Sequence, residues 1–568
     1  MQRKDPYNVC DLAEPRDTQC DIKILMLPMR DGIKLQTIIY FPPELKKSTG
    51  VIYIRSPYTR TTEMAYHSYP QALTHNVVTV MQACRGTGWS EGVFDPAESM
   101  EYECRDAEDT FNWLKTQSWY NGRCVMTGAS YPGWVQWCAM MVKGGNLAGV
   151  APRVAPLYGC TGSARPGGGV SLSFTENWML AMHHRRKYGY GNVPDYEKMQ
   201  IVRKLPVIDA DKHAAYPELA PLRKFFKKAL APGNALQEAF KKFRDFTAPA
   251  YISGGWFDGF KSETIASFML MKSSAAAERA RKYTRLVIGP WGHGGLLNPE
   301  VFGEKCDYRH LLKWADRFLF GLLRDPERDP LPGEPAVRYY MLCENKWHEA
   351  ECWPPAGTVE RKFYLHSRTG ANSLAGDGTL SEEKPLDEKA DVYFSDPAHP
   401  VLSNAGTHAS LGCHDRTLLQ KRSDVLVFTS EKFKEPLTVT GEVKLKFTAS
   451  SSTPDTDFFA TLSWVTPEGK AMLLTTGMVR ARFRNIDREE LLVPDELYDF
   501  ELNLSHIAVR FMPGCAMRLE ICGQHFPAFD RNANSGGPLL QDTELFVSRH
   551  TVYHDSEHPA ELILPCLV

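Results

Sequence analysis

The chain has 568 residues, which predicts two to four domains because a single hydrophobic core rarely serves so long a chain. Hydrophobic residues make up 43% of it and charged residues 24%, as in ordinary globular proteins. The net charge of −2 argues against a general attraction to nucleic acid or to an anionic membrane, so we expect small-molecule partners.

The N-terminal segment and the cysteines indicate the compartment. Residues 1–17 lack the apolar stretch of a signal peptide, and the chain has no uncharged apolar run of about 18 residues that could span a membrane. The fourteen cysteines form no C-x-x-C pair and no Cys/His spacing typical of zinc. We interpret them as buried free thiols and expect a cytoplasmic protein, although a chain stripped of a leader would look the same.

The N-terminal part has the pattern of an α/β protein. Residues 21–28 and 33–41 are β-rich runs around a Gly turn, which predicts a hairpin. From residue 51, apolar strands alternate with helical segments, which predicts a mostly parallel sheet covered on both faces. We interpret the acidic residues of the helix expected at 97–117 as a solvated surface rather than a metal site; they are Glu101, Glu103, Asp106, Glu108 and Asp109.

Ser130 lies in the sequence context of a nucleophile. An apolar run that starts at Cys124 leads into small residues around Ser130, and a helical apolar segment follows at once. A strand, a tight turn carrying serine and a helix are what a nucleophile elbow requires. A second serine, Ser90, lies in a G-x-S-x-G pattern, but Pro96 soon follows and indicates a loop rather than a helix. We therefore predict that Ser130 is the nucleophile of a serine hydrolase.

A base and an acid follow later strands. Asp258 comes after the strand expected at residues 248–255, and His293 lies in the Gly-rich loop after the strand at 285–288. Open α/β sheets build their sites just past the strand ends. The chain order Ser, Asp, His is that of an α/β-hydrolase, with His293 as base and Asp258 holding its imidazole.

Two groups are candidates for stabilising the oxyanion. The backbone N–H of Tyr131 directly follows the nucleophile and is a donor in any elbow of this kind. Tyr58 lies in the loop after the strand at residues 51–54, where a second donor is expected. Spacing alone leaves the role of the Tyr58 hydroxyl open.

The remaining segments predict further units. Residues 160–246 carry aromatic and basic helical runs, which we interpret as a helical cap inserted into the α/β part, its basic runs being solvated faces. From about residue 330 many short strands, the first at Val337–Leu342, predict an antiparallel sandwich. The expected units are 1–159 and 247–329 for the two parts of the α/β-hydrolase domain, 160–246 for the cap and 330–568 for the β-sandwich.

The motifs of this chain resemble those of the X-Pro dipeptidyl-peptidase-like serine hydrolases, particularly the branch of cocaine esterase, glutaryl acylases and α-amino acid ester hydrolases. The matching segments, in chain order, are Arg85-Gly86-Thr87-Gly88, Gly128-Ala129-Ser130-Tyr131, Trp256-Phe257-Asp258, Gly289-Pro290-Trp291-Gly292-His293, Asp455-Thr456-Asp457-Phe458 and Phe526-Pro527-Ala528-Phe529-Asp530-Arg531-Asn532. The resemblance implies an α/β-hydrolase domain, a helical cap and a C-terminal jelly roll. It also implies that Tyr58 donates to the oxyanion, that Trp178 and Phe260 line the acyl pocket, and that no metal or organic cofactor is needed.

One departure from the family bears on the substrate. The α-amino acid ester hydrolases carry ammonium-binding carboxylates two and three residues after the catalytic Asp, where this chain has Phe260 and Lys261. We expect the lysine to repel an ammonium. The sequence therefore favours hydrolysis of a carboxylic ester, or an amide, with a partly aromatic acyl group, through an acyl-enzyme on Ser130.

Alternatives stay open at this stage. An X-Pro dipeptidyl-peptidase or a β-lactam side-chain acylase would use the same residues on a different substrate. A catalytically idle protein whose β-domain binds carbohydrate is the alternative from another class. The sequence does not determine the natural substrate, and it leaves a homo-oligomer open.

Overall fold

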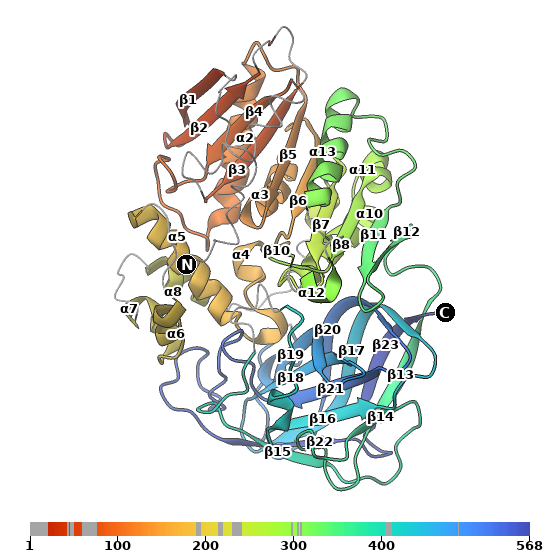
Figure 1. The fold of residues 1–568 in the computed structure, drawn as a ribbon. Coiled ribbons are helices and arrows are strands. Elements are labelled where there is room, and N and C mark those ends of the chain that lie inside the picture. The colour runs from red at the N-terminus through yellow and green to blue at the C-terminus, as the bar shows by residue number, and fades with distance from the viewer. Residues whose placement is uncertain are drawn as a thin grey trace, which may run out of the picture.

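The structure of the protein is a computed structural model that describes residues 21–42, 45, 50–58, 76–188, 195–213, 220–229, 241–296, 299–303, 306, 309–403, 412–486 and 488–568. It consists of an α/β part, a helical segment and a C-terminal all-β domain (Figure 1). Within these ranges, no helix has the length and apolar character needed to cross a bilayer.

The α/β part is built on a 10-stranded mixed sheet with the order β1-β2-β4-β3-β5-β6-β7-β8-β11-β12. Its strands are β1 (Asp21–Pro28), β2 (Lys34–Phe41), β3 (Val51–Ser56), β4 (Val78–Ala83), β5 (Cys124–Ala129), β6 (Leu147–Arg153), β7 (Tyr251–Gly255), β8 (Arg285–Gly289), β11 (Val337–Met341) and β12 (Lys346–Ala350). The predicted hairpin is confirmed as the antiparallel pair β1–β2, and the central strands from β4 to β11 pair in parallel. The carboxyl ends of β3, β5, β7 and β8 therefore lie at one edge of the sheet, which is where the site is built.

Helices cover both faces of this sheet. They are α2 (Ser99–Lys115), α3 (Tyr131–Met140), α10 (Lys261–Ser274), α11 (Glu278–Tyr283), α12 (Pro299–Phe302) and α13 (Arg309–Arg324). Successive residues of β3 point to opposite faces, so Val51 and Tyr53 pack with α2 and α3, whereas Ile52 packs with α13. Burial on both faces explains why the central strands are continuous apolar runs.

The strand Val337–Leu342 was expected in the β-sandwich, and that assignment is wrong. β11 pairs in parallel with β8, and the following β12 pairs antiparallel with β11, so both extend the first sheet. Val337, Tyr339 and Tyr340 are buried there. The first sheet therefore ends at Ala350 rather than near residue 329. A short strand with alternating apolar residues suits either sheet, so its pattern could not reveal its partner.

A helical segment joins β6 to β7, as predicted, and lies between the first sheet and the β-domain (Figure 1). Its helices are α4 (Gly159–Gly162), α5 (Leu172–Tyr188), α6 (Asp195–Val202), α7 (Ala210–His213) and α8 (Ala220–Ala229). The start of α5 is attached to the β-domain, because the N–H of Val170 donates to Asp530 Oδ1 (2.7 Å) and the N–H of Asp530 donates to the Val170 carbonyl (3.0 Å).

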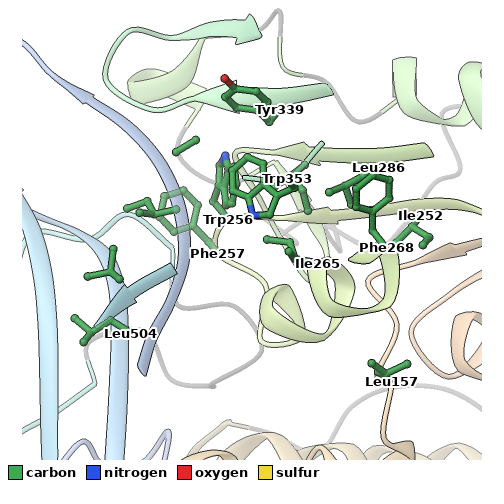
Figure 2. Close-up of a cluster of buried hydrophobic side chains, with 14 of the residues drawn as sticks. Leu157, Ile252, Trp256, Phe257, Ile265, Phe268, Leu286, Tyr339, Trp353 and Leu504 are labelled. Atoms are coloured by element: carbon green, nitrogen blue, oxygen red, sulfur yellow. The ribbon is translucent and has the colours of Figure 1, made fainter. Parts of the chain in front are cut away.

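The C-terminal domain is an 11-stranded β structure in which most pairs are antiparallel, as predicted, while β14 and β16 pair in parallel. Its strands are β13 (Thr358–His366), β14 (Thr379–Ser381), β15 (Asp391–Ser395), β16 (Val425–Ser430), β17 (Leu437–Ser451), β18 (Asp457–Val465), β19 (Ala471–Arg480), β20 (Tyr498–Phe511), β21 (Ala516–Cys522), β22 (Ser548–Tyr553) and β23 (Glu561–Leu567). One apolar core continues from the α/β part into this domain. Figure 2 shows Trp256 and Phe257 in that core, with Leu504 on a strand of the β-domain nearby.

Candidate active site

Ser130 occupies a strained turn between β5 and α3. Its backbone has φ 63° and ψ −127°, a conformation that a residue with a side chain rarely adopts. The turn closes because its neighbours are small: a Cβ at Gly128 would overlap the Pro132 ring, and a Cβ at Gly133 would lie 2.7 Å from Ala155 Cβ. The serine therefore stands at the start of α3 in the geometry of a nucleophile elbow.

The predicted nucleophile, base and acid form one hydrogen-bonded chain. His293 Nε2 lies 2.9 Å from Ser130 Oγ, and His293 Nδ1 lies 2.7 Å from Asp258 Oδ2. Asp258 is buried, and its other oxygen accepts the N–H of Phe260 (2.7 Å). The carboxylate is thus held in place from both sides, and the imidazole can present its unprotonated nitrogen to the serine.

Ser90 does not take part in this arrangement. Its hydroxyl donates to the Ala83 carbonyl (2.9 Å) and accepts the N–H of Gln36 (2.9 Å). No helix starts after it, as predicted, because residues 91–98 form turns and extended chain. Ser90 is a structural residue of the loop after β4.

The loops that carry Asp258 and His293 are joined through their backbones. The N–H of Trp256 donates to the Gly289 carbonyl (2.9 Å), and the N–H of Phe257 donates to the Trp291 carbonyl (3.0 Å). This close approach requires glycine at position 255, because a Cβ there would overlap the backbone of Trp291. The separation of acid and base is therefore set by main-chain bonds as well as by their side chains.

Tyr58 lies beside the nucleophile, where a second oxyanion donor is expected. Its hydroxyl lies 3.3 Å from Ser130 Oγ. Burial raises the pKa of Tyr58, although the hydrogen bond with Ser130 and the N–H of Tyr131 act in the opposite direction. The hydroxyl thus stays protonated at neutral pH and close to both Ser130 and the Tyr131 N–H.

Aromatic rings surround the predicted triad. Phe260 lies edge-on to His293 with ring centroids 5.5 Å apart, and Phe174 of α5 contacts both rings, at 5.4 Å from Phe260 and 6.0 Å from His293. Trp178 stacks on Tyr131 at 6.1 Å. The structure therefore places the predicted Phe260 against His293 and the predicted Trp178 against Tyr131. Phe174 was missed, although it lies one helical turn before Trp178 and so on the same face of α5.

A buried ionic cluster, made of Arg55, Arg85, Glu103 and Asp106, lies behind the elbow. Arg55 Nε is 2.8 Å from Glu103 Oε2 and Arg55 Nη2 is 2.6 Å from Asp106 Oδ2, with all three side chains fully buried. Glu103 also accepts the Tyr131 hydroxyl (2.8 Å), and Arg85 binds Asp106. The cluster thus connects the end of β3 with the residue that follows the nucleophile.

The interpretation of the α2 carboxylates as a solvated surface is therefore wrong for Glu103 and Asp106. Burial raises the pKa of Glu103, an effect that Arg55 opposes, so its charge depends on the arginine. The spacing of these carboxylates, three residues apart, was the available signal for a shared helix face.

The role predicted for Lys261 is not the one that its geometry supports. The side chain is buried, and its amine donates to Thr475 Oγ1 on β19 of the β-domain (3.1 Å). An amine enclosed by protein is not presented to a substrate as a repelling charge. The position of Lys261 in the sequence, next to Phe260, did not reveal that its side chain points to the β-domain.

Comparisons with known proteins identify the family of the chain. Residues 31–295 match the family model for the X-Pro dipeptidyl-peptidase (S15 family), and residues 332–563 match that for the X-Pro dipeptidyl-peptidase C-terminal non-catalytic domain. Cocaine esterase from Rhodococcus sp. is 30% identical over 96% of this chain and 98% of its own length, and a putative serine esterase from Mycobacterium tuberculosis is 24% identical over 90% and 91%.

Among solved structures, an α-amino acid ester hydrolase has a TM-score of 0.81 at 22% identity, and an aminopeptidase from a Thaumarchaeota archaeon has a TM-score of 0.81 at 23% identity. Both alignments cover 98% of this chain and of the other, and both show that the fold is shared along the whole chain. By its sequence matches, the chain belongs to the X-Pro dipeptidyl-peptidase (S15) family.

Proposed function

We propose that the protein is a serine hydrolase that cleaves a carboxylic ester, or an amide, of a small organic molecule. The observation that carries this proposal is the hydrogen-bonded chain from Ser130 Oγ through His293 to Asp258. The similarity to cocaine esterase along nearly the whole chain supports an ester as substrate. The complete triad argues against an idle binding protein, which has no chemical need for it.

The mechanism follows from the positions of these groups. His293 Nε2 takes the proton of Ser130 as the oxygen attacks the carbonyl carbon, and Asp258 stabilises the imidazolium. The Tyr58 hydroxyl and the Tyr131 N–H donate to the oxyanion of the tetrahedral intermediate. The imidazolium then protonates the leaving oxygen or nitrogen, and His293 activates water to hydrolyse the acyl-enzyme.

The acyl group is proposed to lie among aromatic rings. Phe260 and Phe174 pack around His293, and Trp178 packs on Tyr131, so apolar and aromatic groups next to the scissile carbonyl would contact ring surfaces. In this proposal the segment from α4 to α8 acts as a cap, and the C-terminal domain is a jelly roll that helps to close the pocket.

Substrate preference tests the proposal directly. We expect kcat/KM for aryl esters such as benzoates to exceed that for Xaa-Pro amides by at least about 100-fold, because Phe174 and Phe260 put aromatic rings beside His293 and positions 260 and 261 carry Phe and Lys rather than ammonium-binding carboxylates. A preference for the Xaa-Pro amides would establish the peptidase alternative that the family description favours. Absence of activity, together with no labelling by a fluorophosphonate, would favour the binding-protein alternative.

The role of Tyr58 gives a further prediction. Tyr58→Phe should lower kcat for the preferred ester by about 10²–10³, with a small change in KM, because one oxyanion donor is lost while the ring stays. Tyr53→Phe is the matched control: it removes a buried hydroxyl from β3 that bonds Gln82 (2.7 Å) and should change kcat less than about threefold. Equal kcat values for the two variants would exclude the Tyr58 hydroxyl as a donor.

A further inference from the structure

Lys261 makes an unusual contact for the first residue of a helix. Its side chain is buried, and the amine crosses from α10 to the hydroxyl of Thr475 on β19. That hydroxyl donates its own proton to the Leu504 carbonyl on β20, so it is oriented to accept from the amine. A long cationic side chain is buried only when a partner compensates for the lost water, and here the partner is a β-domain residue.

The same lysine begins the helix that follows the catalytic acid. The N–H of Lys261 donates to the Asp258 carbonyl (3.1 Å), and the N–H of Phe260 donates to the Asp258 carboxylate (2.7 Å). Asp258, Phe260 and Lys261 therefore form one tight turn. Anything that fixes the Lys261 side chain also fixes the turn that carries the acid and the aromatic ring against His293.

We propose that Lys261 is a positioning residue through which the C-terminal β-domain holds the catalytic-acid turn in place. The inference rests on the proposed function, because it assigns the contact a role in the same hydrolysis. It gives the β-domain a part in catalysis without any contact between Lys261 and the substrate. Backbone hydrogen bonds hold the turn from the side of the sheet, and the Lys261 amine holds it from the side of the β-domain. Asp258 therefore keeps its hydrogen-bonding position at His293.

The charge of Lys261 has a second consequence. Burial lowers the pKa of its amine to about 7, while the charge of Asp258 opposes this shift. From the β-domain, His506 on β20 faces the same amine: burial chiefly lowers the pKa of this histidine, Glu442 on β17 opposes that effect, and Lys261 and Lys444 add to it. Below about pH 7 the ammonium is thus a positive charge beside the acid.

A double-mutant cycle tests the proposal on the full-length protein, with Lys261→Met and Thr475→Val as single changes. Both replacements keep the approximate shape; Lys261→Met removes the amine, and Thr475→Val removes the hydroxyl that accepts from it together with the bond of that hydroxyl to the Leu504 carbonyl. We expect each to lower kcat about tenfold with little change in KM, and the double variant to be no slower than the singles, because all three lose the same contact.

Ser262→Ala is the matched control. Ser262 is the next residue of α10, and its hydroxyl also crosses to the β-domain, lying 2.6 Å from Ser505 Oγ, but this contact is exposed. Ser262→Ala should leave both kcat and KM unchanged.

The outcomes separate this inference from the proposed function. If the wild type hydrolyses esters and Lys261→Met matches it in kcat, only the inference is overturned. Additive losses in the cycle, or an equal loss in Ser262→Ala, would also overturn it, because they would show general weakening of the domain contact. A wild type that hydrolyses neither esters nor amides overturns the proposed function itself.

Discussion

Ser130→Ala should lower kcat/KM for the preferred ester by about 10⁶, leaving only the catalysis that binding and the oxyanion donors supply. The loss is large because, in the proposed mechanism, the base and the acid serve a pathway that begins with attack by the serine oxygen and passes through the acyl-enzyme on it. Steady-state kinetics with the wild type and the variant measure it. Labelling by a fluorophosphonate, followed by mass spectrometry of the peptide that contains Ser130, should disappear in parallel.

Ser90→Ala is the matched control that the chain itself offers. Ser90 lies in a G-x-S-x-G pattern, but its hydroxyl serves the backbone of Ala83 and Gln36. We expect a change in kcat/KM of less than about threefold, together with a small loss of stability from the missing hydrogen bonds. A residual activity of Ser130→Ala within about 100-fold of the wild type would contradict the assignment of the nucleophile.

Arg55→Met should destabilise the fold by about 3–5 kcal/mol, because it leaves the buried carboxylates of Glu103 and Asp106 without their shared partner. Urea unfolding at neutral pH measures the free energy of unfolding. Because Glu103 accepts the Tyr131 hydroxyl, the same variant should also lower kcat, by loosening the residue whose N–H faces the oxyanion.

Arg30→Met provides the comparison for this prediction. Arg30 also binds carboxylates of α2, Glu108 and Asp109, but it does so at the surface. Solvent screens such pairs, so we expect a much smaller shift of the unfolding midpoint. If Arg55→Met is no less stable than Arg30→Met, the buried cluster does not support the elbow energetically.

That Ser130, Asp258 and His293 meet was predictable because the signals are local. Each of the three residues follows an apolar strand, and parallel strands bring their carboxyl ends to one edge. Ser130 could be chosen over Ser90 because a helix and not a loop follows it. The same logic placed Tyr58 just after β3. The direction of its hydroxyl depends on a loop, so predicting it as an oxyanion donor needed the family resemblance.

Contacts between distant segments could not be predicted in this way. Arg55 and Glu103 are 48 residues apart, and an acidic helix looks solvated when its cationic partners lie on other elements. The side chain of Lys261 reaches a strand more than 200 residues later, so its neighbours in sequence suggested a role in the pocket instead. β11 was misplaced for a related reason, since the pattern of a strand does not name the strand that it pairs with.

The position of β11 and β12 bears on how proteins of this type could exchange parts. The family model for the C-terminal non-catalytic domain begins at residue 332, yet Val337–Met341 and Lys346–Ala350 complete the sheet that carries the triad. A recombination event at that boundary would bring the last two strands of the catalytic sheet from one parent and the rest from the other. The β8 edge would then meet a foreign partner only a few residues from His293. A recombination point that keeps this sheet intact lies after Ala350, in the segment that leads to β13.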